Sequence, residues 1–226
     1  DDTTRASSRI HHTATHVMHA ALRRRLGTHV KQAGSLVGPG RQRFDISHNE
    51  PVNDQDLRAI ETEVNDVLWK TIPVTHETMT NEAAIASGAL AFFGDKYGAE
   101  VRVVTIGDYS KEFCGGTHVH NTGEIGMFRF VSEEGIAAGV RRVEANVGDA
   151  ALAFTHGAED VLARTQEALR VTRQQLPERV LKLNEENKTL LKELEKARGK
   201  IASAGATDLL AAAKFIGGVK VIAHEV

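Results

Sequence analysis

The pattern of apolar and polar residues divides the chain into a mixed region of helices and strands and a later region that is helical alone. Apolar residues recur at helical spacing and predict helices at 8–26, 54–70 and 82–93. Short apolar and β-branched runs bounded by turn residues predict strands at 28–37, 41–47, 101–106, 127–131 and 140–147. This mixture predicts an α+β fold, in which helices pack against a mixed or antiparallel sheet.

Turn residues mark several of these boundaries. Gly27 follows the first helix, and Gly38-Pro39-Gly40 separates the first two strands. A loop bounded by glycines, 135–139, joins the last two strands. The run Arg23, Arg24 and Arg25 closes the first helix, where cations suit the helix dipole. We assign these arginines to helix termination and solvated charge.

The composition changes near residue 150, where glycine becomes scarce and Leu, Glu, Lys, Arg and Ala dominate. Spacings that alternate between four and three residues then form the seam of a long helical or coiled-coil appendage, with one Asn at a seam position. The seam consists of Leu176, Val180, Leu183, Asn187, Leu190, Leu194, Ala197 and Ile201. We expect 150–175 to fold back on this helix as an antiparallel hairpin. Pairing with a second chain, which would give a homodimer, is the alternative.

Three parts follow from these patterns. Residues 1–149 are expected to form the functional domain, 150–203 the long helical region, and 204–226 a linker with the truncated start of another globular domain. The chain begins at Asp1 rather than Met, and 215–222 is typical of a strand that begins a new domain. Our interpretation is that the sequence is a piece of a longer protein.

Composition narrows the class of protein. A formal net charge of −2 argues against a wholesale basic nucleic-acid binder, although local basic patches remain compatible with it. No run approaches the roughly 18 apolar residues of a membrane helix, and no signal peptide is visible, so no membrane partner is expected. A single cysteine allows no intrachain disulfide and fits a reducing compartment, which points to the cytoplasm.

Two histidine- and cysteine-containing pairs, far apart in the sequence, form a candidate zinc site. His12 and His16 are four residues apart on the first predicted helix and therefore share a face. Cys114 and His118 are also four apart, in a loop whose Gly115-Gly116 lets the thiolate and the imidazole converge. Three imidazoles and one thiolate are ligands that suit zinc.

Each pair alone has a plainer explanation. Two histidines four apart on a helix are commonly surface residues, and a lone cysteine is commonly a buried, inert one. No Glu follows His12, so the metalloprotease helix motif is absent. The two pairs together make the stronger case for a metal site.

Several segments resemble the editing domain of alanyl-tRNA synthetases. The resemblance covers about residues 5–150, and 150–226 more loosely resembles the helical segment and the start of the C-terminal domain of that family. That C-terminal domain serves dimerisation and tRNA contact. The matching segments are 12–22, 26–32, 43–48, 92–97, 114–118, 122–126 and 139–144.

The resemblance implies zinc-dependent hydrolysis of tRNA(Ala) mischarged with serine or glycine, with all four zinc ligands matched. It implies that Thr15 reads the serine side chain, where helix packing is the plainer role. It also implies that Gln32 lines the substrate pocket. The simpler alternative is that Gln32 is a glutamine on the surface of a strand. The implied partner is the acceptor end of tRNA(Ala) with its amino acid, with Gly115 and Gly116 contributing to substrate binding.

Other polar residues are candidates on residue type and position. Arg141 and Arg142 follow a glycine-rich turn and are suited to a phosphate or the terminal adenosine. Neighbouring residues on a strand face opposite sides, so only one is expected to do so, and we favour Arg141. No general base can be identified with comparable support; His11 and Asp95 are candidates on residue type alone.

The role of zinc and the activity itself stay open at this point. Zinc would either activate water or bind the amino group of the substrate and orient the ester. Four protein ligands leave no open position, which counts against simple attack by a zinc-bound hydroxide. The alternative function is a structural-zinc module that binds tRNA and dimerises without hydrolysing anything. Aminoacylation is not expected here, because no ATP-binding signature is visible.

Overall fold

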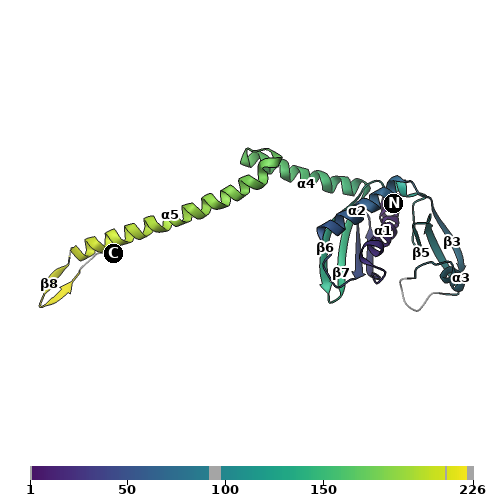
Figure 1. Ribbon diagram of the computed structural model, residues 1–226, viewed down its shortest axis with the longest axis horizontal. Coiled ribbons are helices and arrows are strands. Elements are labelled where there is room, and N and C mark those ends of the chain that lie inside the picture. The colour runs from purple at the N-terminus through teal and green to yellow at the C-terminus, as the bar shows by residue number, and fades with distance from the viewer. Residues whose placement is uncertain (1, 92–97, 212, 223–226) are drawn as a thin grey trace. The chain divides into compact units, whose positions relative to one another are not determined.

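The computed structural model describes residues 2–91, 98–211 and 213–222, and the chain divides into two units, Asp1–Ala158 and Glu159–Val226. The first unit combines antiparallel sheets with packed helices, so the predicted α+β class is confirmed (Figure 1). No helix among the described residues is long and apolar enough to cross a membrane.

A four-stranded antiparallel sheet forms the base of the first unit. Its strands lie in the order β1 (Gln32–Gly38), β2 (Arg41–Ser47), β7 (Val140–Val147) and β6 (Phe128–Ala137). Side chains alternate between the two faces of a strand, and Phe44 of β2 pairs in register with Val143 of β7 on the buried face. The β2 and β7 ranges match those expected from the sequence.

Two helices cover one face of this sheet. Helix α1 (Asp2–Leu26) packs on β1, β2 and β7, and helix α2 (Asp54–Trp69) packs on α1 and β6. Asn53 caps α2, because its side chain accepts a hydrogen bond from the Asp56 amide at 2.9 Å. The apolar faces of both helices and of the sheet form one core.

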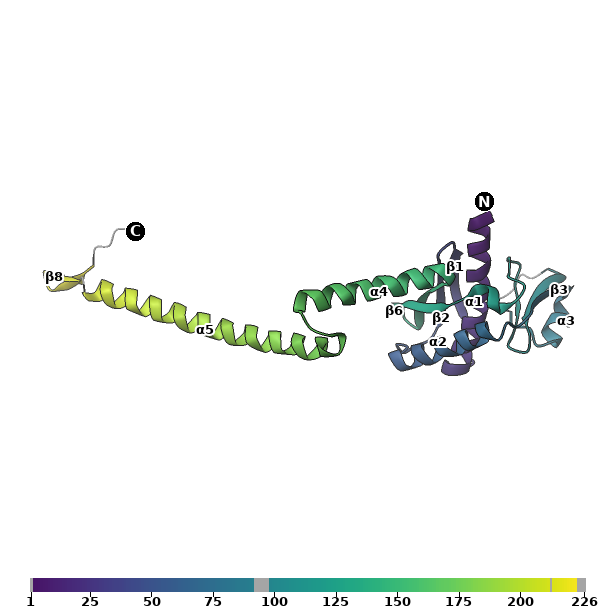
Figure 2. The ribbon, with the colours of Figure 1, turned by 90° about the horizontal axis from the view of Figure 1, so that it is seen from above.

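A second, three-stranded antiparallel sheet lies on the other side of α1. It has the order β3 (Val74–Thr80), β4 (Glu100–Ile106) and β5 (Ser110–Phe113), with the short helix α3 (Asn81–Ala86) against β3 and β4. Both ribbon views place α1 between the two sheets (Figures 1 and 2). The end of β5 therefore brings the segment after Phe113 to the buried histidine face of α1.

The structure differs from the expected elements in several places. Helix α3 ends at Ala86 rather than continuing through the helix expected at 82–93, whose last two residues lie outside the described ranges. Strands β3 and β5 were not predicted, because β3 is rich in polar residues and β5 has only four residues. Strand β1 begins at Gln32 rather than at residue 28. Strand β6 continues to Ala137, through part of the expected loop.

The helical region contains two helices joined by a short turn. Helix α4 (Gly148–Leu169) continues from the first unit into the second, followed by the 3₁₀ turn η2 (Arg173–Gln175) and helix α5 (Leu176–Ala211). The seam residues Leu190 and Ile201 of α5 are 63% and 73% exposed. The part of α4 described with this unit does not cover them, and the pairing of α5 stays a prediction.

The end of the described chain is a small hairpin rather than a single strand. Strands β8 (Lys214–Ile216) and β9 (Val219–Val221) pair antiparallel. The turn between them is Gly217-Gly218, and both glycines have positive φ angles, which glycine adopts without the steric cost of a side chain. Helix α5 also extends beyond the expected end at residue 203.

Candidate metal centre

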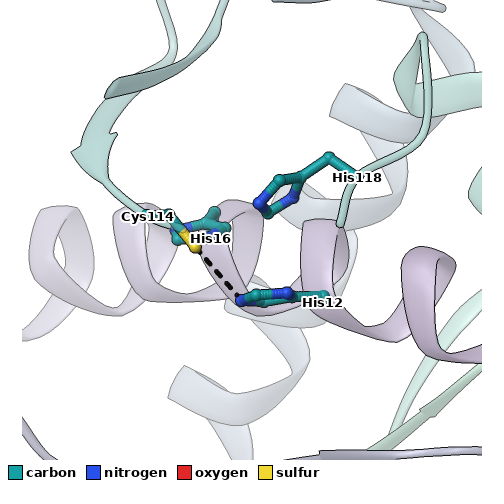
Figure 3. Close-up of side chains that lie close together, drawn as sticks. All are labelled: His12, His16, Cys114 and His118. Atoms are coloured by element: carbon teal, nitrogen blue, oxygen red, sulfur yellow. Dashed lines mark hydrogen bonds between the residues drawn. The ribbon is translucent and has the colours of Figure 1, made fainter. Parts of the chain in front are cut away.

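The four predicted ligands meet at one point between α1 and the loop after β5 (Figure 3). One ligand atom from each of His12, His16, Cys114 and His118 lies within 4.8 Å of the others. The two histidines of α1 share a face because they are one helical turn apart. The loop supplies the remaining pair, so segments distant in the sequence converge as predicted.

The loop between Cys114 and His118 is held against α1 by its backbone and by two arginines. The Cys114 amide donates to the Arg102 carbonyl at 3.0 Å, and the Arg102 guanidinium donates to the carbonyl of Gly116. Arg9 of α1 donates to the His118 carbonyl at 2.8 Å. A β-carbon on Gly116 would collide with the ring of His12, so a larger residue would force the loop or this ring to move.

The donor set fits a zinc ion. Zinc with about 2.0 Å bonds to nitrogen and about 2.3 Å bonds to sulfur in a tetrahedron has ligand atoms about 3.3–3.6 Å apart. The Cys114 Sγ atom lies 3.3 Å from Nε2 of His12. The Nε2 atoms of His16 and His118 are buried and have no hydrogen-bond partner among the described residues. Buried polar atoms need partners, and a metal ion at this point would supply them.

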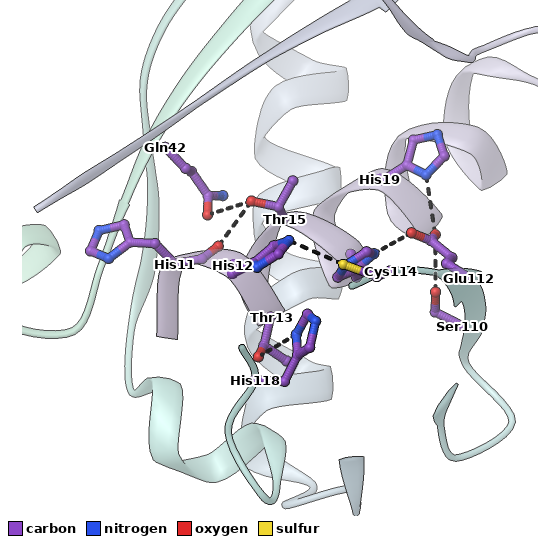
Figure 4. Close-up of polar contacts among 11 residues, drawn as sticks. His11, His12, Thr13, Thr15, His19, Gln42, Ser110, Glu112, Cys114 and His118 are labelled. Carbon is purple, nitrogen blue, oxygen red and sulfur yellow. Dashed lines mark hydrogen bonds and ion pairs between the residues drawn. The ribbon is translucent and has the colours of Figure 1, made fainter. Parts of the chain in front are cut away.

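Each of two ligand rings is oriented by a hydrogen bond at its other nitrogen, and Figure 4 shows the one between His118 and Thr13. The carboxylate of Glu112, only 2% exposed, contacts Nδ1 of His16. It also lies 3.2 Å from Nδ1 of His19 and accepts a hydrogen bond from Ser110 at 3.1 Å. The Thr13 hydroxyl lies 3.2 Å from Nδ1 of His118. Such outer partners fix the tautomer and the direction of a metal-binding imidazole.

The charges of the cluster are mutually dependent. Burial raises the pKa of the Cys114 thiol, but the adjacent imidazoles of His118, His12 and His16 outweigh the effect of burial and lower the pKa to about 3. Burial lowers the pKa of His16, but the Glu112 carboxylate and Cys114 outweigh it and raise the pKa to about 10. The cysteine is therefore a thiolate, the form that binds metals. His16 can release its Nε2 proton to become a ligand while Nδ1–H still donates to Glu112.

A cavity of about 180 Å³ is lined by three of the four candidate ligands, His12, His16 and Cys114. Thr15 of α1 and Gln32 of β1 both line it, so the structure brings these two predicted residues to the site. Ser35 and Phe44, which the sequence did not single out, complete the wall formed by β1 and β2. The cavity therefore combines a few hydroxyl and amide groups with an aromatic side chain, next to the metal centre.

The hydroxyl of Thr15 is already engaged as a donor within the protein. It lies 2.9 Å from the His11 carbonyl and 3.1 Å from Oε1 of the fully buried Gln42. The Gln42 amide nitrogen lies 3.8 Å from the sulfur of Met18. Since a hydroxyl has one hydrogen and two lone pairs, Thr15 can offer the cavity only an acceptor.

The structure does not bring Arg141 to this cavity. Its guanidinium makes two hydrogen bonds, of 2.6 and 2.7 Å, to the carboxylate of Glu133 on the neighbouring strand. Arg142 makes an equivalent pair with Asp45, at 2.7 and 2.9 Å. Both arginines stabilise the four-stranded sheet, and a role for Arg141 in binding RNA stays a prediction.

Of the two candidate general bases, His11 and Asp95, the structure describes only His11. His11 is buried outside the residues that line the cavity, with Nδ1 2.8 Å from the Ser7 carbonyl. Burial lowers its pKa despite that hydrogen bond. Asp95 lies outside the described residues.

Sequence reasoning missed Glu112, although a signal for it existed. Residues two apart on a strand point to the same side, so Glu112 and Cys114 belong together once β5 is recognised. Gln42 and Ser35 carried no comparable signal, because their place at the site depends on how β1 and β2 pack under α1.

Comparison with known proteins agrees with this architecture. Residues 101–144, which include the Cys114 and His118 loop, match the family described as the threonyl and alanyl tRNA synthetase second additional domain. This places the segment that carries Cys114 and His118 within a class of domains found in aminoacyl-tRNA synthetases.

Three similar proteins narrow the class of protein further. The alanine–tRNA ligase of Methylococcus capsulatus is 48% identical over 97% of this chain and 25% of the relative. The ligase of Bordetella petrii is 47% identical over 99% of the chain and 25% of the relative. The ligase of Granulibacter bethesdensis is 48% identical over 100% of the chain and 26% of the relative. The chain is thus identified as a segment of the alanine–tRNA ligase family, and it spans about a quarter of the length of these relatives.

Proposed function

We propose that this chain is the proofreading part of an alanine–tRNA ligase and hydrolyses the ester bond of tRNA(Ala) mischarged with serine or glycine. The observation that carries the proposal is a thiolate and three imidazoles converging beside a small cavity that Thr15, Gln32 and Ser35 line. The membership of residues 101–144 in a synthetase-associated domain family supports it. Charging of tRNA(Ala) with alanine would belong to the complete ligase.

A second site is needed because the pocket in which a ligase activates alanine discriminates poorly against glycine and serine. Glycine is smaller than alanine and cannot be excluded by size. An added hydroxyl, as in serine, is rejected only about 10²-fold by an apolar pocket. A hydrolytic site that accepts serine and glycine but rejects alanine would supply the missing selectivity.

The residues of the chain would hold and orient the reacting ester. Bound zinc would supply Lewis-acid chemistry, by activating water or by orienting the substrate. Glu112 would keep Nε2 of His16 available to the site, and Thr13 would do the same for His118. Gln32, from β1, would contact the amino acid on the side opposite the ligands.

Thr15 would decide between serine, glycine and alanine. Its hydroxyl hydrogen is taken by His11 and Gln42, so its oxygen would accept a hydrogen bond from the serine hydroxyl. Glycine would leave room for a water molecule to donate instead. The methyl group of alanine would exclude that water and leave a buried acceptor unpaired, which costs about 1–3 kcal/mol.

The partner in this proposal is the acceptor end of tRNA(Ala) with its amino acid, and the location is the cytoplasm, where a free thiolate persists. A homodimer would form through α5, whose exposed apolar seam has no cover among the residues described for its unit. The antiparallel hairpin that the sequence favoured is the alternative.

Deacylation assays test the proposal directly. The chain is expected to hydrolyse Ser-tRNA(Ala) and Gly-tRNA(Ala) while leaving Ala-tRNA(Ala) intact, and the Cys114→Ala variant is expected to lose the activity. Circular dichroism of the variant checks that it is folded. A folded Cys114→Ala variant that hydrolyses Ser-tRNA(Ala) at the full rate would rule out the metal centre as the reactive site.

A further inference from the structure

A second and larger cavity lies along α1 beyond the metal centre. It has a volume of about 610 Å³, within the range typical of small-molecule sites. We call it the cationic cavity, because Arg23, Arg24 and Lys111 line it. Glu112 lines both this cavity and the smaller one beside the metal ligands, so the two share a wall.

The arginines of the cationic cavity are fixed in different ways. Arg24 lies 3.8 Å above the ring of Tyr109 and donates at 3.0 Å to Glu63, whose carboxylate compensates its charge. Arg23 donates at 2.9 and 2.6 Å to the carbonyls of Thr28 and Val30, which orient it without neutralising it. Arg23 therefore presents a positioned and uncompensated charge.

Lys111 of β5 adds a second cation to the lining of the cavity. Neither Lys111 nor Arg23 has an ion pair among the residues that the structure describes. Two carboxylates also line the cavity, but Glu112 is buried against His16, which leaves the exposed Asp108. The cavity thus pairs two cations with one accessible hydrogen-bond acceptor.

Arg23 on α1 and Lys111 on β5 lie at similar distances along the chain from the candidate metal ligands. Arg23 follows His16 by seven residues on α1, about 10 Å at the rise of a helix. Lys111 precedes Cys114 by three residues along an extended segment, again about 10 Å. A separation of this order lies between the ester-bearing ribose hydroxyl of a terminal nucleotide and the phosphates on its 5′ side.

We propose that the cationic cavity binds the 3′-terminal nucleotides of an RNA, with a phosphate between Arg23 and Lys111 and a ribose hydroxyl on Asp108. The inference rests on the proposed function, because it takes the ester of that RNA to lie in the smaller cavity. Arginine and lysine bind phosphates through charge-assisted hydrogen bonds. Asp108 would repel a bare anion but accepts a hydrogen bond from a ribose hydroxyl, so a nucleotide fits better than inorganic phosphate.

The test compares Lys111→Glu with Lys70→Glu, a matched control at the exposed end of α2. The first readout is the affinity for an uncharged RNA hairpin ending in the tRNA acceptor sequence, measured by fluorescence anisotropy at several salt concentrations. Lys111→Glu is expected to weaken binding at least tenfold and to reduce the salt slope by about 1. The second readout is Ser-tRNA(Ala) hydrolysis, where KM is expected to rise more than kcat falls. Metal content and circular dichroism check the rest of the domain.

The outcomes separate this inference from the proposed function. If the wild-type chain hydrolyses Ser-tRNA(Ala) and Lys111→Glu behaves like Lys70→Glu, the cationic cavity does not hold the RNA end and the proposed function stands. If the wild-type chain hydrolyses nothing but Lys111→Glu alone weakens hairpin binding, the proposed function fails and the RNA site stands. Competition by inorganic phosphate or AMP at the same concentration as the hairpin would overturn the assignment to RNA.

Discussion

The carboxylate of Glu112 contacts Nδ1 of His16, while Nε2 of the same ring is buried without a partner among the described residues. This relationship fixes which nitrogen of His16 is left for a metal ion. It also explains how a helix residue and a strand residue, far apart in the sequence, act as one unit of the candidate centre.

Replacement of Glu112 is expected to weaken metal binding. Because the carboxylate orients His16, Glu112→Gln is expected to lower zinc affinity about 10–100-fold, and Glu112→Ala to lower it further. Competition with a chromogenic chelator measures the affinity, and Glu185→Gln on the exposed surface of α5 is the control. Equal affinities for Glu112→Gln and the wild type would show that the contact does not position the ligand.

The two loop glycines are expected to respond differently to the same substitution. A β-carbon at Gly116 would collide with His12, whereas one at Gly115 has no neighbour within 4 Å. Gly116→Ala is therefore expected to lose stoichiometric zinc, and Gly115→Ala to retain it. Metal analysis of the two purified variants measures the difference. A Gly116→Ala protein with a full complement of zinc would contradict the close approach of the loop to α1.

Thr15→Val is expected to change selectivity more than folding. The variant keeps the shape of the side chain but removes the acceptor, so kcat/KM for Ser-tRNA(Ala) is expected to fall about tenfold or more, while hydrolysis of Ala-tRNA(Ala) rises. Thr62→Val removes the same kind of helix hydrogen bond from an exposed position and serves as the control. An unchanged ratio of the two rates would mean that Thr15 only packs the helix.

The seam of α5 is expected to pair with a second copy of the chain. Leu190 and Leu194 are 63% and 48% exposed, and an apolar stripe of this length is stabilised by burial against another helix. Residues 1–226 are expected to sediment as a dimer, and the double variant Leu190→Glu, Leu194→Glu as a monomer. A monomeric wild-type chain with a folded α5 would favour the intrachain hairpin instead.

The sequence predicts the four candidate metal ligands better than the strands and side chains that surround them. Helical spacing places His12 and His16 on one face, and the Gly-Gly loop allows Cys114 and His118 to converge, so the ligand set follows from local rules. Strand β3, with its Thr-His-Glu-Thr run, lacks the apolar alternation that marks a strand, and it was therefore missed. The places of Gln42 and Ser35 depend on strand pairing and helix packing, which local patterns do not encode. The partner of Arg141 could not be predicted for a similar reason, since its pairing with Glu133 appears only once β6 and β7 are in register.

Metal removal followed by zinc restoration tests the central claim most directly. Single-turnover hydrolysis of Ser-tRNA(Ala) would be followed for the untreated chain, the chelated chain and the chelated chain given one equivalent of zinc, with circular dichroism recorded for each. The account predicts that chelation abolishes hydrolysis while the helix and strand signals persist, and that zinc restores it. Full activity after complete removal of the metal would contradict the account, and so would unfolding on chelation with no hydrolysis in any of the three samples.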